Sequence, residues 1–163
     1  MSLSPVGCVG LCPIWCDDMI FSVNYGDDPW LRWDNSREEF EVVKALPVLW
    51  TVDGKVVVWF IVKAGFYTDL TSIPRWATAF IPKLGHHVRA AVVHDWTYRK
   101  VHHEGLPRVQ ADLLFVHGMT VDRVSRFQRT VIYRAVRVGG ERSWRSKKKE
   151  IKEDDEFETV ADS

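Results

Sequence analysis

Hydrophobic residues follow a strand-like pattern in the first half of the chain. Between about residues 40 and 62, "FEVVKALPVLW" and "KVVVWFIV" are two runs rich in β-branched and aromatic residues. Asp53 and Gly54 lie between them and favour the tight turn of a hairpin. Pro47 indicates that the first strand lies at an edge or carries a bulge. Because the second run is apolar at almost every position, we expect both faces of its strand to be covered. "MIFSV" predicts one more short strand.

Helical spacing replaces this pattern in the second half. The segment "KAGFYTDLTSIPRWATAFIPKLG" predicts a short helix, capped by Thr71 or Ser72 and ended by Pro82. Three longer helices are expected after it: one from about residue 86 to 100, one from Pro107, and one from Ser125 to the glycines at 139–140. Strands followed by helices, without βαβ alternation, indicate an α+β fold. We expect a small antiparallel sheet and a packed layer of three helices.

The chain has 163 residues, which is enough for one domain with a substantial core. We predict a loop-rich segment over 1–35, an α+β domain over 36–140 and a charged tail over 141–163. The formal net charge is zero, which argues against nucleic acid as the main partner. The longest apolar run, 56–62, is far too short to span a membrane, and the start of the chain does not resemble a signal peptide, so we expect cytosolic synthesis. Eight tryptophans indicate a core or a partner surface built from large flat side chains.

Two groups of potential metal ligands have spacings that do not favour metal. Cys8, Cys12 and Cys16 follow a C-x3-C-x3-C pattern, whereas structural zinc sites need a fourth ligand and usually closer pairs. We interpret these cysteines as reduced, partly buried thiols. The histidine pairs at 86–87 and 102–103 are interpreted as exposed residues at helix ends.

The stretch "AAVVHDWTYRK" places a histidine and an aspartate side by side in an apolar helix. On a helix, His94 shares a face with Tyr98, and Asp95 shares another with Arg99. His94 therefore needs a partner from another segment, and Asp112 is the candidate. The connection between the two helices is short, so they should pack antiparallel and bring these two residues to similar heights. A carboxylate on one imidazole nitrogen leaves the other to act as a general base or a metal ligand.

Asp69 is a second source of oxygen ligands, in a predicted turn among hydroxyl-bearing residues. Together with Asp95 it could hold a hard divalent cation. Arg75 and Ser72 are candidates for binding a substrate carboxylate or phosphate. Structural alternatives stay open for each of these residues. Asp69 can form an Asx turn, Arg75 can pair with either aspartate, and His94 can be a satisfied core histidine.

The segments "KAGFYTDLTSIPRW", "GHHVRAAVVHDWTYR" and "ADLLFVHGM" together resemble domain-of-unknown-function family 1353, a family of phage and prophage proteins. The resemblance extends over about residues 42–140. The positions that match the family's motifs are Thr68, Asp69, Ser72, Pro74, Arg75, His94, Asp95, Tyr98 and Asp112. It implies a phage or prophage origin, other phage proteins as partners, and a place in the host cytoplasm or the virion. It implies no mechanism.

"HDWTYR" and the helix that follows also resemble the paired helices of secreted phospholipase A2, particularly the bacterial type. In that family the histidine activates water, the neighbouring aspartate holds calcium, and an aspartate on the partner helix orients the histidine. By motif these roles fall on His94, Asp95 and Asp112, with Tyr98 in support. This chain lacks the glycine-rich calcium loop and the flanking disulfide, so the turn at Asp69 would have to replace that loop.

Two functions are therefore compatible with the sequence. The first is a phage or prophage protein, associated with the virion or tail, that carries a metal-assisted hydrolase site for ester, amide or phosphodiester bonds. In that site His94 is the base, Asp112 orients it, and Asp95 and Asp69 hold a divalent cation, which the resemblance implies is calcium. The second is a non-catalytic virion, tail or assembly protein in which the same residues only hold the core together. Nucleic-acid binding is disfavoured because an acidic run follows the basic "RSKKK" segment. Its other candidate contacts are Arg123, Arg126, Arg129, Arg134 and Arg137.

Overall fold

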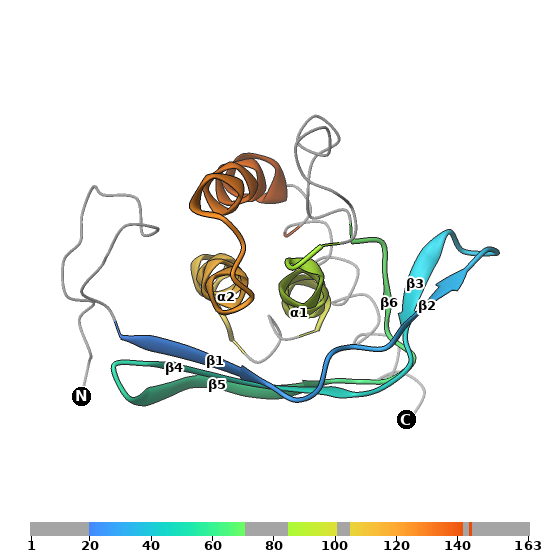
Figure 1. The fold of residues 1–163 in the computed structure, drawn as a ribbon, viewed down its shortest axis with the longest axis horizontal. Coiled ribbons are helices and arrows are strands. Elements are labelled where there is room, and N and C mark those ends of the chain that lie inside the picture. Colours follow the sequence, from blue (N-terminus) through green and yellow to red (C-terminus); the bar gives the residue numbers. More distant parts are fainter. Residues whose placement is uncertain (1–19, 71–84, 101–104, 142–143, 145–163) are drawn as a thin grey trace, which may run out of the picture.

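The computed structural model describes residues 20–70, 85–100, 105–141 and 144. Within these residues the chain forms two antiparallel three-stranded sheets followed by three helices, so the predicted α+β fold is confirmed (Figure 1). The elements are β1 (Phe21–Tyr25), β2 (Leu31–Asp34), β3 (Glu39–Val42), β4 (Leu46–Val52), β5 (Lys55–Val62), β6 (Tyr67–Thr68), α1 (Val88–Arg99), α2 (Arg108–Val121) and a third helix over 126–141.

The larger sheet has the strand order β1-β4-β5 and contains the predicted hairpin. The first run of that hairpin, expected as one strand from about residue 40, is instead divided between β3 of the smaller sheet and β4. Strands β4 and β5 pair from Leu46 opposite Val62 to Val52 opposite Lys55, which leaves a two-residue turn. Both turn residues have left-handed backbone conformations, with φ of 48° at Asp53 and 71° at Gly54. Two consecutive positive φ values define the tight turn that suits the twist of a hairpin. The turn prediction is confirmed.

Pro47 does not lie in an edge strand or at a bulge, and that prediction is wrong. Strand β4 is the central strand, and the register irregularity falls between Trp50 and Thr51. Pairing with β1 ends where Tyr25 faces Val48, one residue before the proline is reached. The carbonyl of Pro47 faces that side and accepts from the backbone N–H of residue 26. Because the missing N–H of the proline lies just beyond the end of β1, no ladder hydrogen bond is lost.

The smaller sheet has the order β2-β3-β6, and its β2–β3 hairpin projects from one end of the molecule (Figure 1). Strands β1 and β2 both come from the segment that the sequence indicated as loop-rich. The strand expected at "MIFSV" is β1, which starts two residues later than that pattern begins. At the tip of the hairpin, Asp34 accepts hydrogen bonds from the backbone N–H and the hydroxyl of Ser36. This Asx-type turn closes the hairpin.

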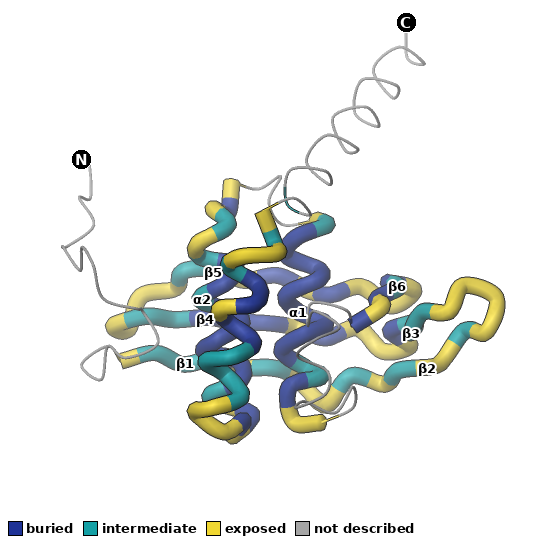
Figure 2. The backbone as a smooth tube through the Cα atoms, turned by 90° about the horizontal axis from the view of Figure 1, so that it is seen from above, coloured by how far each residue is buried: buried dark blue, intermediate teal, exposed yellow. Residues whose placement is uncertain are grey.

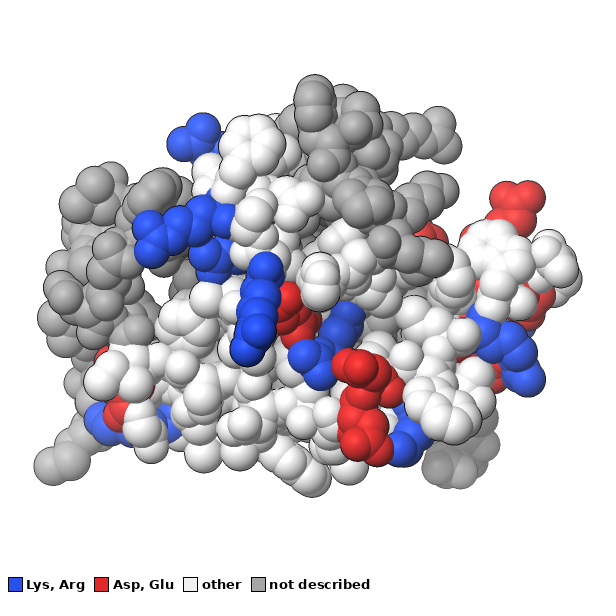
Figure 3. Space-filling view, in the orientation of Figure 1, with Lys and Arg blue, Asp and Glu red and all other residues white. Residues whose placement is uncertain are grey.

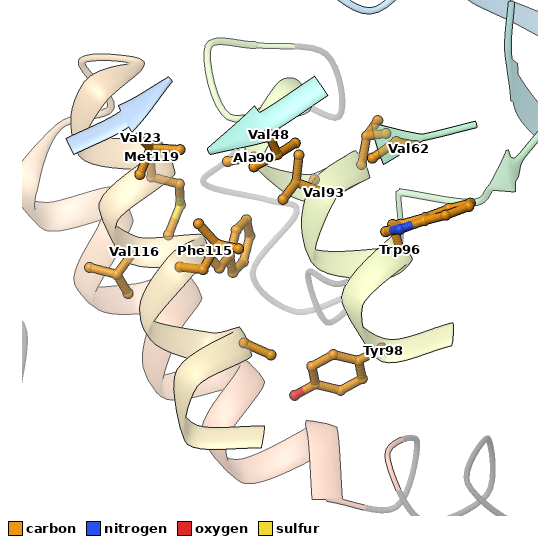
Figure 4. Packing of buried hydrophobic residues seen from close by; sticks show 14 of the residues in the cluster. Val23, Val48, Val62, Ala90, Val93, Trp96, Tyr98, Phe115, Val116 and Met119 are labelled. Carbon is orange, nitrogen blue, oxygen red and sulfur yellow. The ribbon is translucent and has the colours of Figure 1, made fainter. Parts of the chain in front are cut away.

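Helices α1 and α2 lie side by side over one face of the larger sheet, and the third helix lies on the far side of α2 from the sheet (Figure 1). The two helices approach closely at Gly118, where a Cβ atom would lie 3.2 Å from the Cβ of Ala90. Residues 90–98 are all buried, which is why α1 carries no polar stripe (Figure 2). In the core, Val93 of α1 and Phe115 of α2 lie in one cluster with strand residues such as Val48 (Figure 4). Burying each such side chain contributes about 1.5–3 kcal/mol.

Two expectations about exposure are wrong. Phe60 and Val62 of β5 face the helices and are buried, but Trp59 on the opposite face is 61% exposed and Ile61 is exposed too. The apolar composition of β5 therefore does not indicate cover on both faces. His87, expected at an exposed helix end, is buried. Burial, with a smaller effect of His86, lowers its pKa below the ordinary value.

The third helix begins as predicted but ends later. Ser125 caps it by accepting a hydrogen bond from the backbone N–H of Gln128 at 3.3 Å. The helix then continues through the two glycines at which it was expected to stop. The reason is tertiary, because a Cβ atom on Gly140 would lie 2.9 Å from the hydroxyl of Tyr98. Here glycine allows α1 to approach the third helix, and it does not act as a terminator.

Some predictions fall outside the described residues. These are the short helix within 71–84, the cysteines before residue 20, the histidines at 102–103 and most of the charged tail. Trp144 of that tail is described, and its ring packs edge-on against Tyr98 with centroids 4.8 Å apart. Within the described ranges, none of the helices combines the length and the hydropathy that crossing a membrane requires.

Candidate functional site

The candidate site lies where α1, α2 and the third helix meet. His94 and Tyr98 project from α1 one turn apart, and Asp112 projects from α2. All three side chains are buried, and Asp112 is only 1% exposed. The expected contact is confirmed, since Nε2 of His94 lies 3.2 Å from Oδ1 of Asp112. It follows from the antiparallel packing of two helices joined by a short connection.

Tyr98 binds the same carboxylate oxygen as the histidine. Its hydroxyl donates to Oδ1 of Asp112 at 2.6 Å. The imidazole of His94 stacks on the ring of Phe115, with centroids 4.5 Å apart, and its tilted contact with Tyr98 has a centroid distance of 4.3 Å. An ionised carboxylate can only accept, so a neutral His94 carries its proton on Nε2. The packing and the hydrogen bond together hold the imidazole in one orientation and one tautomer.

Two arginines bind the other oxygen of Asp112. Nη1 of Arg137, from the third helix, donates to Oδ2 at 2.8 Å, and Nε of Arg108 lies 3.6 Å from the same atom. Burial acts to raise the pKa of Asp112, but hydrogen bonds from His94, Tyr98 and Arg137 outweigh it and hold that pKa below its ordinary value. Asp112 is therefore an ionised carboxylate that binds residues from three helices.

Arg108 extends this network to the backbone of the third helix. Its Nη2 donates to the carbonyls of Val136 at 3.0 Å and of Arg137 at 2.9 Å, and its Nη1 binds Glu141. Its Nε donates to the hydroxyl of Tyr98 at 3.3 Å. Burial and the nearby Asp112 raise the pKa of Tyr98 well above its ordinary value, so the phenol stays protonated and can donate. The network is thus continuous from α1 to the third helix.

Asp95 turns away from this network towards the end of β6. The hydroxyl of Thr68 donates to Oδ2 of Asp95, and the same hydroxyl accepts from the backbone N–H of Leu70 at 3.3 Å. Arg99, the expected local partner of Asp95, instead donates to the carbonyl of Tyr67 at 3.0 Å. His94 and Asp95 therefore serve different neighbours, as their divergence around the helix axis predicts.

The residues proposed as metal ligands differ in their surroundings. Asp95 is buried, whereas Asp69 is exposed, although the two segments meet at the Thr68–Asp95 hydrogen bond. Among the described residues, no group of three His, Cys, Asp or Glu side chains is arranged to hold a metal ion. The candidate substrate-binding residues Ser72 and Arg75 lie outside the described residues.

The sequence reasoning missed both arginines of the network. Arg108 precedes Asp112 by four residues on α2, so their pairing could have been read from helical spacing. From sequence alone, Arg137 is one of several arginines that are candidate nucleic-acid contacts. Only the packing of that helix on α2 shows that it points inward to Asp112.

Comparison with known protein families shows which family the chain resembles. A family described as "Protein of unknown function (DUF1353)" matches residues 44–136. This range contains β4, β5, β6, α1, α2 and most of the third helix. Neither the curated proteins nor the solved structures give a significant match, and the resemblance to phospholipase A2 receives no support from these comparisons. The family match covers more than half of the chain and includes His94, Tyr98, Arg108 and Asp112, but not Arg137 or Glu141. The chain therefore belongs to the DUF1353 family.

Proposed function

We propose that this chain is a phage- or prophage-encoded hydrolase in which His94 acts as the general base and Asp112 orients it. The observation that carries the proposal is the arrangement around Oδ1 of Asp112, which binds both Nε2 of His94 and the hydroxyl of Tyr98. A buried carboxylate that holds one nitrogen of an imidazole directs the other towards a reacting group. The phage or prophage origin rests on the motifs quoted above.

The proposed reaction is the attack of water on an ester, amide or phosphodiester bond. Nδ1 of His94 takes a proton from water while the water oxygen bonds to the carbonyl carbon or the phosphorus. The proton then passes to the leaving group as the old bond breaks, which returns His94 to its neutral form. Asp112 stays ionised throughout, and Tyr98 keeps the carboxylate in place.

The phospholipase-like motif implies a calcium ion on Asp95 and Asp69, but no step is assigned to a cation. One oxygen of Asp95 is bound by Thr68, and the described residues do not assemble three ligands. The calcium hypothesis has its own test, which is a change in melting temperature on adding calcium. A shift in the wild type that Asp95→Asn abolishes would support it, and the same midpoint with calcium or with a chelator would contradict it.

A second candidate is a non-catalytic virion, tail or assembly protein, located in the host cytoplasm or the particle. Two observations favour it. Asp112 binds residues from three helices, as a structural centre would. Three tryptophans, Trp30, Trp33 and Trp59, are exposed and are suited to contacts with other phage proteins. In this role His94 and Asp112 stabilise the core and have no substrate.

Turnover assays separate the two candidates. The purified chain would be assayed with p-nitrophenyl butyrate, bis(p-nitrophenyl) phosphate and phosphatidylglycerol vesicles. His94→Gln is the test variant, since the glutamine amide can replace Nε2 as a donor to Asp112 but offers no base. His86→Asn, at an exposed position before the same helix, is the matched control.

The hydrolase predicts turnover in the wild type and in the control, and loss of at least about 100-fold in His94→Gln, the range for a general base. Circular dichroism must show that His94→Gln is folded at the assay temperature. No turnover of any probe by the wild type, or equal turnover by His94→Gln, contradicts the hydrolase. The assembly protein predicts that the chain is present in purified particles, and mass spectrometry of those particles tests it.

A further inference from the structure

Four arginines lie on the third helix or in the loop just before it. Arg123 lies in the loop before the helix, and Arg126, Arg129 and Arg134 lie on the helix itself. Within the described part of the chain, none of the four forms an ion pair. Figure 3 shows a group of Lys and Arg side chains at the upper left, over this helix. We call these four residues the arginine face.

Other arginines of the fold are matched. Arg32 pairs with Glu41, Arg89 with Asp122 and Asp28, Arg108 with Glu141, and Arg137 with Asp112. The arginine face therefore differs from these four arginines, each of which meets a carboxylate. In the part of the chain that the structure describes, no carboxylate pairs with the charge of the arginine face, even though the whole chain has a formal net charge of zero.

Arg129 is held in place by hydrogen bonds. Its Nη1 donates to the hydroxyl of Thr120, which in turn donates to the carbonyl of Val116 at 2.8 Å. Its Nε is buried without a hydrogen-bond partner. Burial, and next the charge of Arg126, lower the pKa of Arg129 below its ordinary value. The guanidinium is thus oriented in advance and sits beside a like charge, an arrangement that an anion would relieve.

The spacing of the face suits a ligand with more than one anionic group. Arg126 and Arg129 are one helical turn apart, and Arg134 lies about 12 Å along the axis from Arg126. Phe127 is 68% exposed and shares a stripe with Arg134, because residues seven apart fall on one side of a helix. Arginines beside an exposed aromatic ring are a common arrangement where phosphates are bound and bases stack.

We propose that the arginine face binds phosphate groups, with Arg126 and Arg129 as the principal contacts and Arg123 and Arg134 extending the site. The phosphates come either from the backbone of a single-stranded nucleic acid or from a free polyphosphate. This departs from the expectation drawn from the neutral composition, since composition averages over the chain whereas the face concentrates unpaired positive charge. The proposal does not depend on the His94–Asp112 site.

Binding of two probes tests the proposal. A fluorescein-labelled 15-nucleotide oligothymidylate is followed by anisotropy, and inorganic tripolyphosphate by calorimetry. The test variants are Arg126→Gln/Arg129→Gln and Arg126→Gln/Arg134→Gln; the second removes only exposed side chains, so it keeps the fold. The matched control is Lys55→Gln/Lys63→Gln, which removes two exposed charges at the ends of β5.

We expect each arginine variant to lose at least tenfold in affinity, while the lysine control stays within twofold of the wild type. For the oligonucleotide, the slope of log K against the logarithm of the salt concentration should also become shallower by about 1.4. The reason is that each single-strand phosphate contact contributes about 0.7 to this slope, and each variant removes two contacts. Binding of oligothymidylate that tripolyphosphate does not displace identifies nucleic acid as the source, and tripolyphosphate binding alone identifies the free anion. Failure of the wild type to bind either probe, or an equal loss in the lysine control, overturns the proposal.

Discussion

Replacing Asp112 with asparagine is the sharpest test of the three-helix network. Oδ1 of Asp112 accepts from His94 and Tyr98, and Oδ2 accepts from Arg137. An asparagine amide keeps one acceptor oxygen and brings an NH2 group that can only donate. Whichever way the amide is turned, one set of donors loses its acceptor. The arginines also lose the negative charge that they share.

The expected loss follows from burial and from what is left unpaired. Removing one partner of a buried ion pair typically costs about 3–5 kcal/mol of unfolding free energy. Since the side chain of Arg137 is 36% exposed, water can solvate part of its charge, and we expect the lower end, about 3 kcal/mol. For a chain of this size, that corresponds to a fall in melting temperature of roughly 6–12 °C.

Urea unfolding and thermal scans at pH 7 measure this loss. Asp27→Asn is the control, because Asp27 forms an exposed pair with Lys44, and its replacement should leave both midpoints unchanged. Combining Asp112→Asn with Arg137→Met should destabilise less than the sum of the single changes, since the unpaired charge is then absent. A loss below about 1 kcal/mol for Asp112→Asn, or strict additivity in the double variant, would refute the network as a stabilising centre.

The fall of the unfolding free energy at acid pH tests the direction of the Asp112 pKa shift independently. Because the folded-state pKa of Asp112 is lowered, its contribution is complete above the ordinary carboxyl pKa of about 4 and is lost as the pH falls through the lowered value. Asp112→Asn should therefore be less sensitive to pH below about 4 than the wild type. A steeper acid limb in the variant would contradict the direction of the shift.

Three further predictions concern the packing around the site. Gly118→Ala should destabilise by about 1–3 kcal/mol, because its Cβ would clash with the hydroxyl of Tyr25. Gly139→Ala meets nothing within 4 Å and should stabilise by roughly 0.5–1 kcal/mol; urea unfolding checks both. Burial lowers the pKa of His117 to about 4, so unfolding free energy should fall by up to about 3 kcal/mol between pH 6.5 and 4. His117→Asn, which can still accept from Trp50 through its amide oxygen, should flatten that fall, and an unchanged slope would show that another group titrates. Thr68→Val should lower the unfolding free energy by about 1–3 kcal/mol, because buried Asp95 loses the hydroxyl donor of Thr68. Thr68→Ser keeps that hydroxyl and should keep most of the stability. Equal losses in the two variants, measured by urea unfolding, would mean that the hydroxyl does not stabilise the fold.

Much of the candidate site could be predicted because it depends on helix geometry. The four-residue spacing of His94 and Tyr98, and the short connection to the helix carrying Asp112, were enough to predict the His94–Asp112 contact. The pairing of Arg108 with Asp112 follows the same four-residue spacing and could also have been predicted. The contact of Arg137 with Asp112 could not be predicted, because it depends on how the third helix is rotated and placed against α2.

The fold shows the same division between local and distant effects. The hairpin turn at Asp53 and Gly54 could be predicted because a positive φ is a property of the two turn residues themselves. The place of Pro47 in a central strand could not be predicted, because it depends on where β1 stops pairing with β4. Trp59 is exposed although its strand is apolar on both faces, since hydrophobic sequence does not reveal which face the helices cover.

By itself, the sequence determined the change from strands to helices, the tight turn, the cap at Ser125 and the residues that share a helix face. Each of these depends on contacts within a few residues, which local chemistry specifies. Only the tertiary structure decided that Asp112 joins three helices, that the third helix continues through Gly139 and Gly140, and that Arg137 turns inward to a carboxylate. These outcomes depend on packing between segments far apart in the chain, where small differences in rotation and distance decide which groups meet.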